Sequence, residues 1–116
     1  MTRTRAAIAA ALVATLVLAS AFAPGALARG STTIAVGDDF FSPSSKTIAS
    51  GTKVKFNWVG DSKHDVVKKR GPGGGFSSGI TDQQGVNFTK KFKKVGTYKL
   101  ICSIHAEDMK LKLTVE

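Results

Sequence analysis

The sequence predicts an all-β protein, a Greek-key β-sandwich of about six to eight short strands. Apolar residues recur with a period of two, whereas no segment longer than a turn shows the 3.6-residue spacing of an amphipathic helix. Glycine, proline and serine separate these segments at short intervals, as turn residues do in sheet proteins. Both observations favour short strands with one buried face and one solvated face.

The N-terminus has the features of a signal peptide. Two arginines precede an apolar stretch, 8–22, and a small-x-small pattern ends at Ala28. We expect cleavage after Ala28, so that 1–28 is the signal peptide and 29–116 is one domain of 88 residues. Pro24 and Gly25, between the apolar stretch and the cleavage position, argue against a retained membrane anchor. The protein is therefore expected to be exported, to the periplasm or to the extracellular space.

Three segments in the first half of the domain have strand character. They are 32–36, 46–48 and 53–58. The third is the clearest, because Val54, Phe56 and Trp58 alternate with polar residues. Turn residues at 37–39 follow the first segment, and Pro43 marks an irregular or edge position before the second.

The second half combines one loop of unusual composition with further strands. Three basic residues and a run of glycines predict a flexible basic loop at 68–75. The strands that follow are expected at 86–92, 97–102 and 111–115. In the first of them Val86, Phe88 and Phe92 are spaced to lie on one face, and in the second Cys102 lies on the same face as the apolar residues.

The single cysteine and the positive charge restrict the function. Cys102 has no cysteine partner in the chain, so it is an intermolecular bridge, a reactive thiol or a metal ligand. Without the signal peptide the chain has a net charge of +7. That charge favours acidic proteins, anionic membrane surfaces or nucleic acid as partners, and by itself distinguishes none of them.

Three potential metal ligands lie within eight residues of one another near the C-terminus: Cys102, His105 and Met109. The only other histidine is His64, in a distant loop. Copper sites that transfer electrons use one thiolate, two imidazoles and a weak axial thioether. The chain contains this set, which predicts a copper site at one end of the sandwich.

The motifs around these residues resemble those of the plastocyanin/azurin family of cupredoxins, the blue copper proteins. The stretch GTYKLICSIH at 96–105, followed by Met109, is similar to the family's C-terminal copper motif, and HDV at 64–66 is similar to its upstream histidine motif. The likeness extends from residue 32 to residue 116. It implies one copper ion, cycling between Cu(I) and Cu(II), with His64, Cys102 and His105 as equatorial ligands and Met109 as the axial ligand.

The chain also departs from the family pattern. Three residues separate His105 from Met109, as in azurins, and Leu111 occupies a position where plastocyanins usually have glycine. Asp65 replaces the usual asparagine, a residue that braces the site. A carboxylate beside the metal should favour the cupric state and lower the reduction potential.

The resemblance implies an electron carrier and not an enzyme. His105 would be the electron port, with Ile104 and Ala106 contributing to the docking surface. Two histidines cannot build the additional copper sites of an oxidase. The alternative is an extracytoplasmic protein that binds and delivers copper.

The expected partners are redox proteins. A basic patch would steer acidic partners toward the protein, or would be only a solvated loop; its residues are Lys68, Lys69 and Arg70. We expect a monomer that binds no nucleic acid and has no stable membrane anchor.

Overall fold

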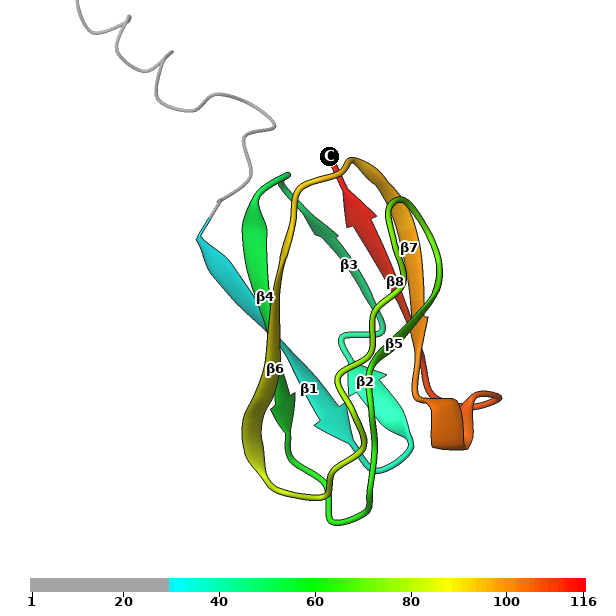
Figure 1. Cartoon of the computed structure of the whole chain (residues 1–116). Coiled ribbons are helices and arrows are strands. Elements are labelled where there is room, and N and C mark those ends of the chain that lie inside the picture. The colour runs from blue at the N-terminus through cyan, green and yellow to red at the C-terminus, as the bar shows by residue number, and fades with distance from the viewer. Residues whose placement is uncertain (1–29) are drawn as a thin grey trace, which may run out of the picture.

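The computed structural model describes residues 30–116, and the predicted signal peptide lies outside them. The described chain forms eight strands in two four-stranded sheets, with one short 3₁₀ turn (Figure 1). The predicted all-β sandwich is therefore confirmed. None of the helical turns in this part of the chain has the length or apolar character needed to span a membrane.

The first sheet has the strand order β2-β1-β4-β6, and the second has the order β3-β8-β7-β5. The strands of the first sheet are β1 (Ser31–Gly37), β2 (Phe40–Ser42), β4 (Thr52–Trp58) and β6 (Gly85–Phe92). Those of the second are β3 (Ser45–Ile48), β5 (Val67–Arg70), β7 (Gly96–Ile101) and β8 (Lys110–Val115). β1 pairs with β4, and β3 with β8, in parallel; the other pairs are antiparallel.

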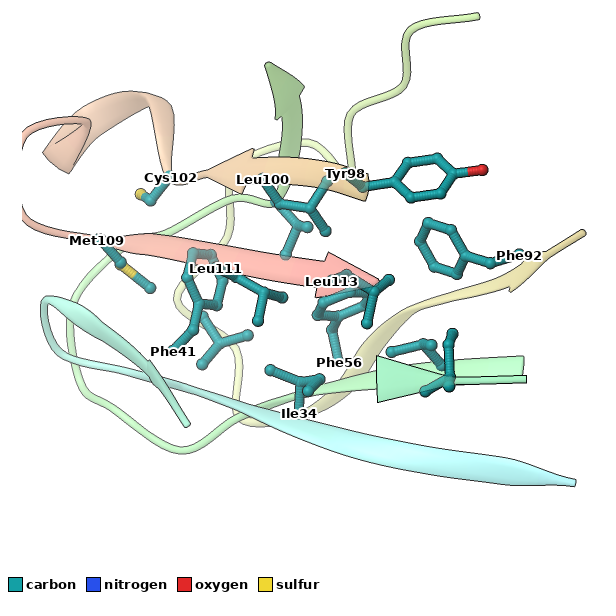
Figure 2. Packing of buried hydrophobic residues seen from close by; sticks show 14 of the residues in the cluster. Ile34, Phe41, Phe56, Phe92, Tyr98, Leu100, Cys102, Met109, Leu111 and Leu113 are labelled. Atoms are coloured by element: carbon teal, nitrogen blue, oxygen red, sulfur yellow. The ribbon is translucent and has the colours of Figure 1, made fainter. Parts of the chain in front are cut away.

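The core fills the space between the sheets, as Figure 2 shows. Alternation along β4 buries Val54, Phe56 and Trp58 to 1% exposure or less. Leu100 and Leu111 are paired neighbours on β7 and β8 and are also buried. Burying one such side chain stabilises the fold by about 1.5–3 kcal/mol. The bulky residue at position 111 is therefore a core residue.

The parallel pairing of β1 and β4 brings the turn after β1 and the loop after β4 together at one end of the sandwich. Both strands finish at the same end of the first sheet, so the turn after β1 lies against the loop after β4. Asp38 in that turn accepts hydrogen bonds from the backbone N–H groups of Asp61 and Ser62 in that loop. The chain then continues to His64, which contacts Cys102 directly after β7.

One sequence prediction about the basic segment was wrong. Lys68, Lys69 and Arg70 were expected in a flexible loop, but they belong to β5, which pairs with β7 at the edge of its sheet. Lysine and arginine are common on edge strands because they discourage pairing with other chains. Nζ of Lys68 also donates hydrogen bonds to carbonyl groups of the glycine-rich segment, to Pro72 and Gly73 at 2.6 Å each.

A bulge in β6 changes the orientation of another predicted core residue. Phe88 pairs with Phe56, but the next register pair joins Val86 to Asn57, so one extra residue lies between them. The extra residue reverses the alternation. Val86 is therefore 51% exposed, while Phe88 packs against the core.

Candidate metal centre

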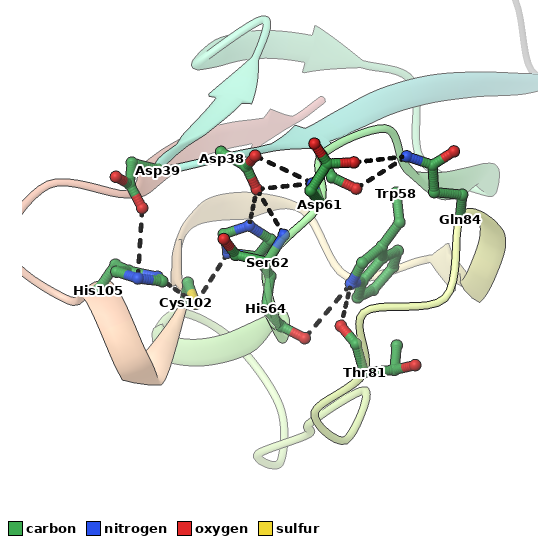
Figure 3. Close-up of polar contacts among 11 residues, drawn as sticks. Asp38, Asp39, Trp58, Asp61, Ser62, His64, Thr81, Gln84, Cys102 and His105 are labelled. Atoms are coloured by element: carbon green, nitrogen blue, oxygen red, sulfur yellow. Dashed lines mark hydrogen bonds and ion pairs between the residues drawn. The ribbon is translucent and has the colours of Figure 1, made fainter.

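Three of the predicted ligand side chains meet at one end of the sandwich. The ligand atoms of His64, Cys102 and His105 all lie within 4.8 Å of one another. Sγ of Cys102 lies 3.9 Å from Nδ1 of His64 and 3.6 Å from Nδ1 of His105 (Figure 3). His64 and Cys102 are fully buried, whereas the side chain of His105 is 29% exposed.

The backbone around His64 is fixed by its neighbours. His64 and Thr81 exchange two backbone hydrogen bonds of 3.0 Å each. The indole N–H of Trp58 donates to the carbonyl oxygen of Thr81 at 3.0 Å. These bonds satisfy the polar groups of a buried segment. They hold the histidine without any metal.

The loop between Cys102 and Met109 is closed by its own backbone. The N–H of Cys102 donates to the carbonyl of Met109 at 3.1 Å, and the N–H of Met109 donates to the carbonyl of His105 at 2.9 Å. His105 ends the 3₁₀ turn Ser103–His105, and Nδ1 of its ring lies 3.6 Å from the thiol of Cys102. Met109 is fully buried, and Figure 2 shows its side chain at the same end of the core as Cys102.

Asp65 connects the two loops that carry the candidate ligands. Its side chain is buried, and its two oxygens accept hydrogen bonds from the N–H and the hydroxyl of Ser103, each 2.6 Å long. Ser103 directly follows Cys102, and Asp65 directly follows His64. One carboxylate therefore holds both ligand segments together.

Two acidic residues at this site were interpreted from the sequence only as part of a turn. Oδ1 of Asp38 lies 2.9 Å from Nε2 of His64, and Oδ1 of Asp39 lies 3.3 Å from Nε2 of His105 (Figure 3). The contacts of Asp38 with Asp61, His64 and Ser62, in decreasing order of effect, hold the pKa of its carboxyl well below the usual range. Sequence spacing does not reveal these contacts, since they depend on how β1 ends beside the ligand loops.

The residues that were predicted to form surfaces lie as follows. Ile104 is 46% exposed beside His105, and Ala106 is half-buried. Lys69 and Arg70 are exposed, but Lys68 is half-buried and bound to the glycine-rich segment. Two residues of the predicted basic patch are therefore exposed, and the third is half-buried.

The donor set fits a copper ion. A thiolate and two imidazole nitrogens suit copper in both oxidation states, and a methionine sulfur nearby is a weak additional donor. Each histidine directs Nδ1 toward the thiol and Nε2 toward a carboxylate, so the inner nitrogen of each ring is available to a metal.

Comparison with known families agrees with the fold and the motif. A family model for a cupredoxin-like domain matches residues 7–115. The chain belongs to this family. The family predicted from the motifs is thereby confirmed. No curated protein matches this cupredoxin in sequence.

Solved structures with the same fold include blue copper proteins. Plastocyanin from Dryopteris crassirhizoma shares 28% identity, with a TM-score of 0.60 over 73% of this chain and 100% of the fern protein. A reduced mutant of amicyanin shares 18% identity, with a TM-score of 0.66 over 78% and 86% of the two chains. A purple cupredoxin from Nitrosopumilus maritimus shares 21% identity, with a TM-score of 0.60 over 73% and 99%.

Proposed function

We propose that this cupredoxin binds one copper ion and carries single electrons between protein partners outside the cytoplasm. The observation that supports this most directly is the cluster of one thiol and two imidazole Nδ1 atoms at the end of the sandwich. Solved structures similar to this chain include oxidised and reduced forms of a mutant fern plastocyanin and a reduced Cu(I) form of an amicyanin mutant. We infer that Met109 would supply a further, weak sulfur donor, because it is buried at the same end of the core.

Bound copper supplies the one-electron chemistry, and the chain supplies a fixed and dry environment. The backbone bonds at His64 and in the 102–109 loop hold the donors in place. The carboxylate of Asp65 prevents the two ligand segments from moving apart. A cage that keeps its geometry in both oxidation states lowers the reorganisation that accompanies each transfer.

Electrons would enter and leave through His105. Its ring is the part of the donor cluster that reaches the surface, with 29% of the side chain exposed. Two exposed apolar side chains lie close in sequence to this contact: Ile104, 46% exposed, and Phe40, 48% exposed and adjacent to Asp39. Apolar surface of this kind is suited to brief docking with another protein.

The positive charge on the outer face of the second sheet supports the proposal of acidic partners. Arg70 pairs in register with Lys99, and Lys99 with Lys112, so three cations lie on adjacent strands. Like charges directly opposite one another are destabilising. No carboxylate of residues 30–116 forms an ion pair with any of the three. They line a groove of about 520 Å³ that extends to Ala106 of the ligand loop.

An acidic partner in this groove would neutralise the repulsion and lie close to His105. Attraction between opposite charges increases the rate of encounter at low salt. Lys69 also lines the groove, whereas Lys68 does not.

We further infer that the protein is a monomer, is exported after removal of 1–28, binds no nucleic acid and catalyses no reaction of its own.

Electron transfer and copper delivery differ in what is exchanged rapidly. An electron carrier should exchange electrons between its Cu(I) and Cu(II) forms quickly and release copper slowly. The first rate is measured by NMR line broadening in mixtures of the two forms, and the second by transfer of Cu(I) to a coloured chelator. Fast loss of copper with slow electron exchange would instead support the delivery function.

A further inference from the structure

The turn after β1 contacts the outer nitrogens of both histidines. Asp38 and Asp39 are adjacent in sequence, yet they approach different rings, at 2.9 Å for His64 and 3.3 Å for His105. Apart from these two, no ion pair occurs between basic and acidic side chains within residues 30–116. In a chain with many more basic than acidic residues, both acids of one turn are placed at the metal site.

Asp38 is held firmly in its position. The N–H of Asp61 donates to both of its oxygens at 3.0 Å, and the N–H of Ser62 donates to Oδ1 at 2.9 Å. Gly60 lies so close that an added Cβ would collide with the Asp38 carboxylate. Backbone N–H groups of the loop after β4 therefore hold the carboxylate at the point where it contacts the His64 ring.

Asp39 reaches its histidine from a left-handed backbone conformation. Its φ is +69°, which is unfavourable for most residues but accessible to aspartate and asparagine. The side chain is 61% exposed and lies over the ring edge that is proposed as the electron port. Replacement by asparagine keeps the backbone preference and nearly the same shape, removes the negative charge and leaves one acceptor oxygen.

We propose that the Asp38–Asp39 turn positions both histidine ligands and, through its two carboxylates, favours Cu(II) over Cu(I). A carboxylate that accepts from the outer nitrogen of a metal-bound imidazole makes the ring a stronger donor. A stronger donor stabilises the more highly charged ion, so the reduction potential is lowered. This inference rests on the proposed copper function.

The test compares Asp38→Asn, Asp39→Asn and the double variant with the wild type. Losses of an outer carboxylate typically reduce metal affinity by about 10–100-fold. We expect Asp38→Asn to reduce the Cu(II) affinity relative to the Cu(I) affinity by about tenfold. This change raises the one-electron reduction potential by about 59 mV. Asp39→Asn should raise the potential by less, because its contact is longer and more exposed.

Asp61→Asn is the matched control. Asp61 lies in the loop beside Asp38, but its carboxylate contacts Gln84 and no histidine. The control removes the same charge and should move the potential by less than either contact variant. Equal shifts of the reduction potential in Asp38→Asn, Asp39→Asn and Asp61→Asn would show a general charge effect and overturn the proposal.

A second measurement needs no copper. In the metal-free protein, ¹⁵N-detected imidazole NMR should show the His64 proton on Nε2, where Asp38 accepts it, and Asp38→Asn should alter that signal. An unchanged His64 signal would contradict the positioning role even if no copper complex formed. A blue complex whose potential is the same in all variants would reject the proposal and leave the electron-carrier function intact.

Discussion

The two hydrogen bonds between Asp65 and Ser103 should contribute much of the stability of the end of the sandwich that carries His64 and Cys102. Asp65→Ala removes two hydrogen bonds of 2.6 Å from a buried carboxylate. Hydrogen bonds to charged groups contribute about 1.5–3 kcal/mol each. Ser103 is exposed and can be solvated in the variant, so the lower value applies to each bond. We therefore expect a loss of about 3 kcal/mol in the free energy of unfolding.

Urea unfolding of the metal-free protein measures this loss. With a slope near 1 kcal/mol per molar urea, the midpoint for Asp65→Ala should fall by about 3 M. Ser103→Ala removes only the hydroxyl bond and should cost about 1.5 kcal/mol. In the double variant the two losses should not add, because both single changes break the same bond. Additive losses, or an Asp65→Ala midpoint within about 0.5 M of the wild type, would refute the reasoning.

Three further predictions follow from other contacts. Asp65→Asn keeps the bridge but removes its charge, so redox titration should give a higher potential than the wild type; an equal or lower value would contradict this. Burial raises the pKa of Tyr98, so the folded state retains this proton more tightly than the unfolded state. The stabilisation from the neutral Tyr98 phenol is complete below the ordinary tyrosine pKa near 10 and is lost as the pH rises through the pKa of Tyr98 in the folded state. Tyr98→Phe loses the hydrogen bond to the Lys94 carbonyl and should therefore be less stable than the wild type at pH 7. Because the variant has no phenol to ionise, its free energy of unfolding, measured with urea, should fall less between pH 9 and 11. An equal alkaline loss in both proteins would argue against the burial effect. Lys99→Glu should slow oxidation of the Cu(I) protein by anionic hexacyanoferrate(III) several-fold at low salt, and the difference should shrink at high salt. Lys53→Glu, on the other sheet, is the control, and an equal effect there would show that only net charge matters.

The sequence predicted those features that depend on local pattern. Alternation of Val54, Phe56 and Trp58 identified β4, because one face of that strand is buried and the other is solvated. The spacing of Cys102, His105 and Met109 predicted a metal-binding loop, because these residues lie close together in the chain, and two of them belong to the candidate metal cluster. Both kinds of signal are contained within a few residues.

Features that depend on distant contacts were not predicted. β5 was interpreted as a loop, because its basic residues lack an apolar pattern and its pairing with β7 is not encoded locally. Val86 was expected to lie on the same face as Phe88, but a bulge against β4 turned it outward. Asp38 and Asp39 become part of the site only because β1 ends beside the loops that carry the histidines.

The visible absorption spectrum of the mature protein, recorded after addition of Cu(II) and then of ascorbate, tests the central proposal most directly. A thiolate bound to Cu(II) in the site of His64, Cys102 and His105 should give an intense band near ~600 nm that disappears on reduction. Cys102→Ser should abolish the band, and Ser103→Ala should retain it. Absence of the band in the wild type, with Cys102 free or oxidised, would contradict the assignment of this protein as a copper electron carrier.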